Sequence, residues 1–291
     1  MVDGKTNILG VIGDPIEHTF SPAMQNAGLN ALALNYIYLP FHVLPQNLEN
    51  AISGAKALGI KGLNVTIPHK QEVINFLDDI DSIAKMIGAV NTIDFSYDDG
   101  SVIAKGYNTD AYGAVRAIEE KTSLNDKKVT ITGAGGASRA VAFQIANSGI
   151  MELSILNRNY NKAKNLADDL KNNLKEFDID IIINAYELDE LKREISESDV
   201  LVDTSPLGMY PNINQKPIAS SDMLHEDLVV NDIVYTPMET SLIKEAKKAG
   251  CEVVYGYKML LYQGVRSLEI WLGREAPVEE MEKALLDVLG I

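Results

Sequence analysis

Short apolar runs alternate with amphipathic helical stretches along almost the whole chain, and this alternation constrains the fold more than any other feature. Strands that are separated by helices pair in parallel, because the chain crosses back over the sheet between one strand and the next. Six strands interleaved with helices in the second half predict a doubly wound sheet of the Rossmann type. These strand candidates are residues 129–132, 152–156, 181–184, 200–203, 229–233 and 252–254.

A separate α/β unit with a mostly parallel sheet is predicted in the first third of the chain. Its strand candidates are residues 8–12, 36–40 and 62–67, followed by a hairpin of 92–96 and 102–105, and its helix candidates are 22–32, 48–58, 71–78 and 82–87. Residues 259–291 are predicted to form two helices that return to this unit, since the second sheet is complete without them. We predict a first domain of residues 1–109 plus 256–291 and a Rossmann domain of residues 110–255.

The composition restricts the partners of the chain. Its formal net charge of −15 argues against nucleic acids and anionic membranes, since both attract basic surfaces. No apolar run approaches the ~20 residues that span a bilayer, and the start of the chain lacks the pattern of a signal peptide. The single cysteine, Cys251, fits a reducing compartment, so we expect a cytoplasmic protein. The four histidines lack the spacing of metal ligands, and no metal site is predicted.

A glycine-rich loop follows the first strand of the predicted Rossmann sheet, and a helical stretch begins directly after it. Glycines allow a tight turn and a close approach of the backbone to a pyrophosphate, whose charge is favoured at a helix N-terminus. A glycine pattern by itself often marks only a turn, but the order of strand, loop and helix predicts a dinucleotide site. The residues of the loop are Gly133, Ala134, Gly135, Gly136, Ala137 and Ser138.

The end of the next strand favours NADP over NAD. NAD sites usually place an acidic residue here, which binds the ribose 2′-hydroxyl. This chain instead has Asn157, Arg158 and Asn159, with Lys162 four residues after Arg158. A guanidinium stacks on adenine and binds a 2′-phosphate through two hydrogen bonds, so we expect NADP as the cofactor. The alternative is that the cations form a solvated helix start, as Arg139 would on the preceding helix.

Lys70 occupies an unusual place for a lysine. The chain passes from an apolar strand through Pro68, a residue that suits the first position of a helix. We therefore expect Lys70 in the first turn of a helix, where the macrodipole disfavours a charged amine. Such a placement has a reason if the amine exchanges a proton or holds a substrate hydroxyl, with Asp110 as its partner. A lysine that only faces solvent is the alternative.

Other polar side chains lie in the loops of the first domain. Thr19 and Ser21 precede a helical stretch, where a hydroxyl would cap the helix or bind a carboxylate. Asn91 follows another helix, where its amide would cap that helix or hold a ligand hydroxyl. Asp110 comes after a strand and a turn, at the expected junction of the two domains.

Six segments together resemble the shikimate dehydrogenase family. They occur in the order of the family and span nearly the whole chain: residues 16–22, 64–70, 88–92, 106–110, 133–138 and 259–263. The resemblance implies the NADP-dependent, reversible reduction of 3-dehydroshikimate to shikimate in aromatic amino-acid biosynthesis. It further implies an enzyme that acts on small molecules as a monomer or homodimer.

The resemblance also implies the roles of individual residues. Lys70 and Asp110 would form the catalytic pair, and Lys70 would donate to the C3 oxygen of the substrate. The substrate carboxylate would be bound by Thr19 and Ser21, with Tyr235 as a third contact, and the ring hydroxyls by Thr66, Asn91 and Gln263. The cofactor would be bound by the glycine loop, by Asn157, Arg158, Asn159 and Lys162, and by Ile233 and Gly256.

Four positions depart from the family pattern. Thr19 stands where serine is usual, Lys258 where glycine is common, and Ala111 and Asp203 where glycine and asparagine are frequent. One alternative is an enzyme that oxidises both quinate and shikimate with NAD or NADP, for which the pocket around Thr19 would decide. Another is a non-catalytic nucleotide-binding regulator on the same fold, against which the presence of Lys70 and Asp110 argues.

Overall fold

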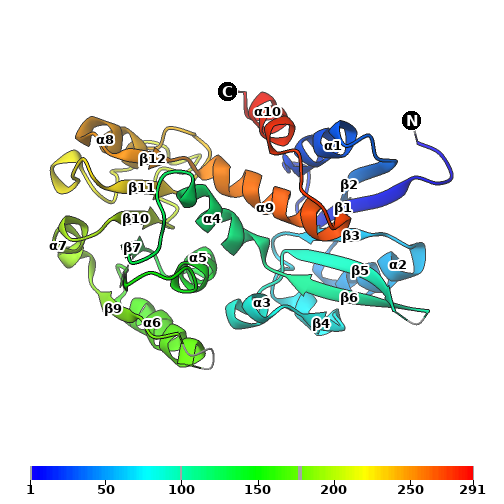
Figure 1. The fold of residues 1–291 in the computed structure, drawn as a ribbon, viewed down its shortest axis with the longest axis horizontal. Coiled ribbons are helices and arrows are strands. Elements are labelled where there is room, and N and C mark those ends of the chain that lie inside the picture. The colour runs from blue at the N-terminus through cyan, green and yellow to red at the C-terminus, as the bar shows by residue number, and fades with distance from the viewer. Residues whose placement is uncertain (1, 99, 176–178, 291) are drawn as a thin grey trace. The chain divides into compact units, whose positions relative to one another are not determined.

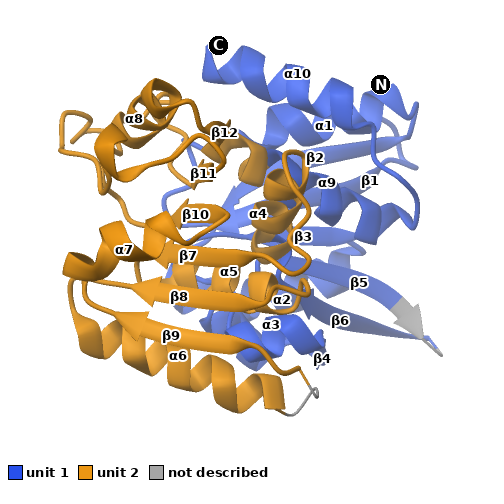
Figure 2. Cartoon of the chain, turned by 60° about the vertical axis from the view of Figure 1, so that its left-hand side comes forward, with its two compact units in different colours: residues 1–109, 261–291 blue, residues 110–260 orange. Residues whose placement is uncertain are grey.

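The computed structural model describes residues 2–98, 100–175 and 179–290. The chain forms two compact units, coloured separately in Figure 2. Unit 1 comprises Met1–Thr109 and Leu261–Ile291, and unit 2 comprises Asp110–Leu260. The chain returns to unit 1 inside a continuous helix, α9 (Gly256–Leu272), whereas the sequence placed the return at the start of that helix.

Unit 1 is built on a mixed six-stranded sheet with the strand order β2-β1-β3-β5-β6-β4 (Figure 1). Strand β1 pairs in parallel with β2 and β3, while β5 is antiparallel to β3 and β6. The strands are β1 (Asn7–Gly13), β2 (Tyr36–His42), β3 (Gly62–Val65), β4 (Asp79–Ile80), β5 (Thr92–Asp98) and β6 (Ser101–Tyr107). The helical segments before β6 are α1 (Ser21–Ala31), η1 (Pro45–Asn47), α2 (Leu48–Leu58), η2 (Glu72–Phe76) and α3 (Ser82–Ile87).

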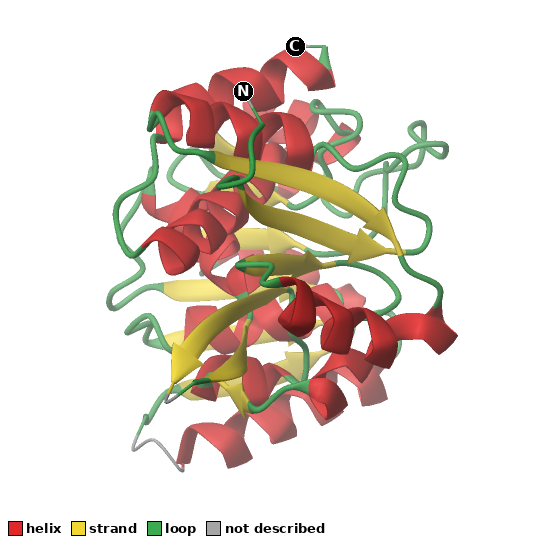
Figure 3. Ribbon diagram, turned by 90° about the vertical axis from the view of Figure 1, so that its right-hand side faces the viewer, coloured by secondary structure: helices red, strands yellow, loops and turns green. Residues whose placement is uncertain are grey.

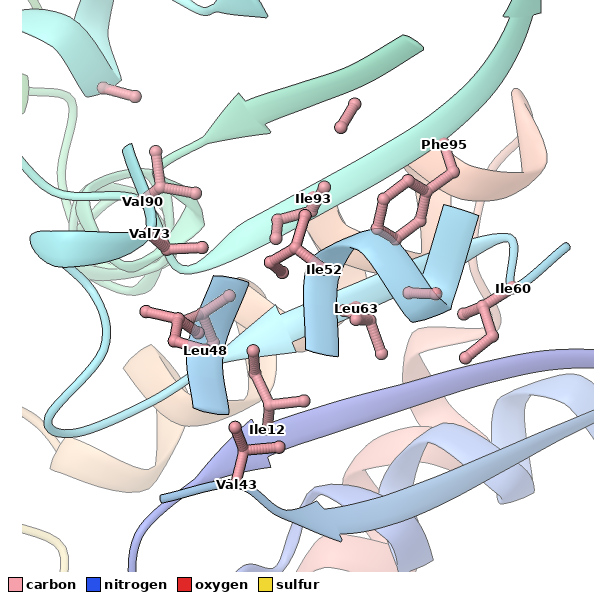
Figure 4. Packing of buried hydrophobic residues seen from close by; sticks show 14 residues of the cluster. Ile12, Val43, Leu48, Ile52, Ile60, Leu63, Val73, Val90, Ile93 and Phe95 are labelled. Carbon is pink, nitrogen blue, oxygen red and sulfur yellow. The ribbon is translucent and has the colours of Figure 1, made fainter. Parts of the chain in front are cut away.

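The two faces of this sheet are covered by different helices, as Figure 3 shows. Successive residues of a strand point to opposite faces. Leu63 of β3 therefore joins Ile93 and the α2 residues Leu48 and Ile52 in one apolar cluster, drawn in Figure 4. The neighbouring position, Gly62, faces the other way, toward Trp271 of α9.

Glycine at position 62 is required by the close approach of α9. A Cβ atom there would lie 2.0 Å from Trp271 Nε1, and this ring nitrogen donates to the Ile93 carbonyl at 2.9 Å. Helix α10 (Val278–Leu289) packs on α1, where Gly28 admits Met281. The C-terminal helices thus complete unit 1, which confirms the prediction made for the tail.

Unit 2 has a fully parallel six-stranded sheet with the order β12-β11-β10-β7-β8-β9, which is the doubly wound order. Its strands are β7 (Lys128–Thr132), β8 (Glu152–Leu156), β9 (Ile182–Tyr186), β10 (Val200–Asp203), β11 (Val229–Asp232) and β12 (Glu252–Val254). Its helices are α4 (Thr109–Glu119), α5 (Gly136–Ala146), α6 (Tyr160–Lys175), α7 (Leu191–Ser196) and α8 (Ser241–Ala249), with short 3₁₀ segments at η3 (Leu188–Glu190) and η4 (Ser221–Met223). The predicted Rossmann fold is confirmed.

One predicted helix is wrong. Residues 67–71 form turns, and only a five-residue 3₁₀ helix, η2 (Glu72–Phe76), follows them, so Lys70 does not lie in the first turn of an α-helix. The carbonyl of Lys70 accepts its hydrogen bond from the distant Val90 N–H at 2.8 Å instead of from the next helical turn. The macrodipole therefore gives no reason for the position of this lysine, and the reason has to come from its neighbours.

Candidate active site

The turn that carries Lys70 follows β3 and is held by hydrogen bonds on both sides. Besides the bond between the Lys70 carbonyl and Val90, the N–H of His69 donates to the Thr66 carbonyl at 3.0 Å. The buried His69 ring places Nε2 2.6 Å from the carbonyl of Val43. A carbonyl only accepts, so Nε2 carries the proton. These bonds set the point from which the half-buried Lys70 side chain extends.

The side-chain amide of Asn91 joins the start of β5 to the start of α4. Its Oδ1 accepts from the N–H of Thr109 at 2.7 Å, and its Nδ2 donates to Thr109 Oγ1 at 3.0 Å. The backbone carbonyl of Asn91 accepts from the Val65 N–H at 2.8 Å. Asp110 follows Thr109 directly, so Asn91 helps to fix the place of this carboxylate in the first turn of α4.

Asn91 belongs to a larger set of buried polar side chains, the Asn64 cluster: Tyr38, Asn64, Asn91, Thr92, Thr109 and Ser267. The Tyr38 hydroxyl donates to Asn64 Oδ1 at 2.7 Å. Asn64 Nδ2 reaches Thr92 Oγ1 at 3.0 Å and Ser267 Oγ at 2.9 Å. Ser267 Oγ also lies 3.1 Å from Thr109 Oγ1. Because these side chains are hydrogen-bonded to one another, burying them costs little free energy, and the cluster has little freedom to rearrange.

The predicted carboxylate-binding hydroxyls lie at the start of α1, close to the same cluster. Phe20 is the N-cap of α1, so Ser21 is the first helical residue and not its cap. Thr19 Oγ1 accepts from the N–H of Ser21 at 3.3 Å. The Ser21 side chain is hydrogen-bonded to Tyr38, whose pKa is raised by burial so that it stays a donor.

The predicted site residues divide between the two units. Unit 1 contains Thr19, Ser21, Thr66, Lys70, Asn91 and Gln263, and unit 2 contains Asp110 and Tyr235. Within unit 1 the cluster connects three of the six, because Ser267 also donates to the backbone carbonyl of Gln263 on α9 at 2.9 Å. Hydrogen bonds therefore link the surroundings of Ser21, Asn91 and Gln263 into one arrangement.

The glycine loop of unit 2 leaves the end of β7 and opens α5. Gly133 has a φ of +109°, and a Cβ atom there would lie 2.4 Å from Thr204 Oγ1, so only glycine fits. Ser138 is buried and donates its hydroxyl to the Gly133 carbonyl at 2.7 Å, which closes the loop on itself. Gly135 and Gly136 are exposed with open space above them, and Ala134 and Ala137 complete the loop.

The cations predicted to bind a phosphate follow β8. Arg158 lies just before α6 and Lys162 at its start, and both are exposed. The Asn157 amide donates to the carbonyl of Asn159 at 3.0 Å and so shapes the turn between strand and helix. Arg139 instead pairs with Asp169 at 2.8 Å, which suits a residue on a helix surface.

The strand order of this sheet reverses between β7 and β10. On the β10 side of this point, Gly256 lies against the backbone of Ile233. A Cβ atom on Gly256 would lie 2.4 Å from the Val234 carbonyl, so the start of α9 rests directly on the backbone after β11. Ile233 and Tyr235 line a cavity of about 460 Å³ within unit 2. The cavity lies at the carboxyl ends of β10 and β11, the edge of the sheet at which doubly wound folds bind their ligands, and β10 borders the point where the strand order reverses.

Known proteins of one family match this chain along almost its full length. The shikimate dehydrogenase substrate binding domain matches residues 11–93, the shikimate / quinate 5-dehydrogenase family residues 116–235, and the shikimate 5′-dehydrogenase C-terminal domain residues 256–286. Shikimate dehydrogenase (NADP(+)) of Methanobrevibacter smithii is 52% identical over 291 residues, which cover all of both chains. This chain belongs to the shikimate dehydrogenase family.

Solved structures of the family have the same fold. A crystal structure of shikimate dehydrogenase in complex with NADP+ has a TM-score of 0.88 at 46% identity, covering 99% of this chain and 98% of that one. Shikimate 5-dehydrogenase from Listeria monocytogenes, in complex with shikimate and NAD, has a TM-score of 0.90 at 34% identity, covering 98% of both chains. The resemblance to shikimate dehydrogenases that the sequence motifs predicted is confirmed.

The loop of unit 2 fits the dinucleotide that this family implies. The N–H groups at the start of α5 have no side-chain cap, since Gly135 is the N-cap, and they face the open space above the two exposed glycines. Such N–H groups bind a pyrophosphate. From Asn157 to Lys162 after β8 the side chains are amides, two cations and Tyr160, with no acidic residue, so a phosphorylated ribose would meet no carboxylate there.

Sequence reasoning missed the Asn64 cluster. Asn64 lies between Leu63 and Val65 in a strand of buried residues, and an amide in such a run is a signal because a buried polar group needs partners. The partners of Asn64 were not visible in the sequence, since Ser267 lies far along the chain on α9.

Lys258, which stands where glycine is common in the family, forms an ion pair within unit 2: its Nζ donates to Glu120 Oε1 at 3.1 Å.

None of the described helices has the length and apolar character needed to cross a bilayer. Among the residues that the structure describes, His, Cys, Asp and Glu side chains do not gather into a group of three that would hold a metal ion.

We expect Thr109→Val to destabilise the protein by about 1–3 kcal/mol, the usual cost of leaving buried polar groups without a partner. The variant keeps the volume of Thr109 and its backbone bond to Asn91, but Asn91 Nδ2 loses its acceptor and Ser267 Oγ loses a hydroxyl partner. The measurement is the free energy of unfolding in urea. Thr122→Val is the matched control, because Thr122 lies at the surface and should change stability little. Equal midpoints for the two variants would show that the cluster contributes nothing.

Proposed function

We propose that this protein catalyses the reversible, NADP-dependent reduction of 3-dehydroshikimate to shikimate, in the cytoplasm and as a monomer or homodimer. One observation carries the proposal: hydrogen bonds hold the backbone of Lys70, the amide of Asn91 and the residue before Asp110 in one arrangement. The resemblance of the motifs supports Lys70 and Asp110 as the catalytic pair. The reaction would serve aromatic amino-acid biosynthesis.

The two units would divide the binding. Unit 1, completed by the C-terminal helices, would bind the substrate, and unit 2 would bind the cofactor. Thr19 and Ser21 suit the substrate carboxylate, because their hydroxyls lie at the N-terminus of α1, which favours negative charge. Tyr235 of unit 2 is proposed as the third carboxylate contact.

The ring hydroxyls of the substrate need donors and acceptors held in fixed places. Thr66, Asn91 and Gln263 supply a hydroxyl and two amides, and the bonds described above restrain the backbone of all three. Asn91 commits Oδ1 and one Nδ2 proton to Thr109, so its second Nδ2 proton is the one proposed to reach a substrate oxygen.

Lys70 and Asp110 are proposed to carry the acid–base chemistry. When bound, NADPH supplies the hydride that reduces the C3 carbonyl. As this carbon is reduced its oxygen gains negative charge, and the Lys70 ammonium donates the proton that makes it a hydroxyl. Asp110 orients the Lys70 amine and accepts a hydrogen bond from the neighbouring hydroxyl. In the oxidative direction Lys70 takes the proton back.

The cofactor would lie across the carboxyl ends of the strands of unit 2. The N–H groups at the start of α5 would bind the pyrophosphate, while Arg158 and Lys162 would bind the 2′-phosphate, with Asn157 and Asn159 shaping their turn. Ile233 and Gly256 would contact the nicotinamide end, next to the cavity after β10 and β11.

The alternative function is a dual quinate and shikimate dehydrogenase using NAD or NADP. It is favoured by the match to a family described as shikimate / quinate 5-dehydrogenase. Quinate carries an additional ring hydroxyl. The methyl group by which Thr19 differs from the usual serine would therefore affect which of the two substrates fits the pocket.

One assay distinguishes the two functions: purified protein is given shikimate or quinate with NADP+ or NAD+, and NADPH or NADH formation is followed by absorbance. Reduction of NADP+ with shikimate alone supports the proposal, and comparable kcat/KM with quinate would replace it by the alternative.

Lys70→Ala should lower kcat by ~10²–10⁴-fold, the usual contribution of a positioned acid or base, with a modest change in KM. Steady-state kinetics in both directions measure this, and Lys85→Ala, which removes an exposed lysine of α3, is the control that should behave as wild type. An unaltered kcat in Lys70→Ala would remove this residue from the chemistry.

Arg158→Ala should weaken NADPH binding about 10–100-fold, since a hydrogen bond to a charged group contributes ~1.5–3 kcal/mol. NADH lacks the 2′-phosphate, so its Kd should change far less. Fluorescence titration with both nucleotides gives the two ratios. Lys192→Ala, at an exposed position of α7, should leave both Kd values unchanged. Equal losses for NADPH and NADH would show that Arg158 does not read the phosphate.

A further inference from the structure

Two buried carboxyl groups of unit 2 lie side by side at the ends of neighbouring strands. Asp203 ends β10 and Asp232 ends β11, and the two are direct partners in the parallel pairing of these strands. Their exposed fractions are 1% and 0%. Because partners in a ladder point to the same face, both side chains lie on one side of the sheet. No residue of the proposed reaction explains why two acids are buried together.

Each carboxyl group holds the beginning of the loop that follows its strand. Asp203 accepts from Thr132 Oγ1 at 2.8 Å, from the Ser205 N–H at 2.9 Å and from Ser205 Oγ at 3.0 Å. Asp232 accepts from the Val234 N–H at 3.0 Å and from Thr240 Oγ1 at 2.6 Å. Thr240 is the N-cap of α8, so this helix begins at the Asp232 carboxylate.

The two loops are the walls of the cavity of about 460 Å³ in unit 2. Ser205 and Val234, whose N–H groups the two acids hold, both line it. The other lining residues are Thr204, Pro206, Met209, Tyr210, Ile233, Tyr235 and Thr236. The shape of the cavity therefore depends on the hydrogen bonds of both carboxyl groups.

Two adjacent carboxyl groups in a dry environment do not both ionise readily. Burial raises the pKa of Asp203 and of Asp232, and the charge of Asp203 raises the pKa of Asp232 further, to about 7. Asp203 receives three hydrogen bonds from donors and Asp232 two, which favours the charge on Asp203. As pH falls through about 7 the pair therefore takes up a proton, and that proton lies on Asp232.

The other charged groups near the pair lie toward the surface and do not neutralise it. On the loop before α8 and on α8 itself, Glu239 and Lys247 pair with each other and Lys244 is exposed. Lys216, on the loop after β10, is exposed, and Lys258 of α9 is bound to Glu120. Thr132, the partner of Asp203 on β7, is uncharged, and so is Val254, the partner of Asn231 on β12. The phenols that line the cavity are Tyr210 and Tyr235.

We propose that Asp203 and Asp232 are positioning residues, and that the proton on Asp232 couples NADPH binding in this cavity to pH. The proposal rests on the proposed function, in which unit 2 binds NADPH. When the proton leaves, the two carboxylates repel each other and release the Ser205 and Val234 backbones from their places in the cavity wall. A bound polyanion favours the protonated pair, so binding takes up a proton, and by reciprocity a rise in pH weakens binding.

The pair also has a consequence for the cofactor-free protein. An ordinary aspartate in the unfolded chain titrates near 3.8, whereas Asp232 titrates near 7 in the folded protein. The folded state therefore holds its proton more tightly between these values, and the stability that this gives is present below pH 3.8 and lost as pH rises to about 7. The Tm of wild type should fall over this window more than that of a variant without the pair.

The test compares wild type with Asp203→Asn and Asp232→Asn. The amide introduced by Asp203→Asn keeps the size of the side chain and can still accept from Thr132 and from the Ser205 N–H, but it carries no charge. Asp222→Asn is the control, since Asp222 is an exposed aspartate of the same unit. Two quantities are measured from pH 5 to 8.5: the Tm without cofactor, and the Kd for NADPH by fluorescence. The 2′-phosphate of NADPH titrates near pH 6 itself, so each comparison is made between variants with the same ligand.

For wild type and Asp222→Asn we expect the Kd for NADPH to rise by on the order of tenfold between pH 6 and 8.5, a normal size for coupling between two sites. In Asp203→Asn the Kd should rise only by the amount that titration of the NADPH 2′-phosphate causes. The Tm of this variant should also fall less steeply with pH than the Tm of wild type. Asp232→Asn mimics the protonated residue, so at pH 8.5 it should bind NADPH more tightly than wild type does at the same pH.

The same pH dependence of Kd in wild type and in both pair variants would overturn the proposal. Failure of the proposed function is seen separately: wild type would then not bind NADPH at any pH, while the Tm curves of wild type and the pair variants would still differ. If one pair variant fails to fold, the other supplies the same two comparisons.

Discussion

The hydrogen bonds between the Asn91 amide and Thr109 are the interaction on which the candidate site of unit 1 depends. Asn91, buried directly before β5, connects the end of β3 through its backbone carbonyl and the first turn of α4 through its side chain. A buried amide without partners would be costly, so the surrounding hydroxyls are a condition of the fold as much as of the site. The two residues of the proposed acid–base pair are next to groups held in this way. Val90, the neighbour of Asn91, donates its N–H to the Lys70 carbonyl, and Thr109, which binds the Asn91 amide, directly precedes Asp110.

Unit 2 relies on a different constraint, the close approach of backbones around glycine. Gly133 is packed against Thr204, and Gly256 against the Val234 carbonyl, so the strand ends of the sheet are drawn together on both sides of the switch point. The same crowding buries Asp203 and Asp232 beside the cavity. The acids and the glycines are thus two results of one dense arrangement at the carboxyl ends of the strands.

The sequence predicted the architecture well, because hydrophobic periodicity and glycine placement are local signals. All six strands of unit 2, the two C-terminal helices and the family were predicted correctly. The helix at Lys70 was wrong because the bond that decides it comes from Val90, which no local pattern reveals. The pairing of Asp203 with Asp232 needs the strand order, and the Asn64 cluster needs the packing of α9 on β3, so neither was visible. The roles of the individual site residues and the functions of the two domains stay predictions.

The bond from Ser138 to the Gly133 carbonyl has a consequence for how a ligand is received. A loop that is already locked by its own side chain has little conformational freedom left to lose. The free energy of its contacts with a pyrophosphate then contributes to affinity, because little of it is needed to order the loop. Association of the ligand also does not require a segment to fold first. In this chain a serine at the last position of the glycine motif makes the cradle rigid before any ligand arrives.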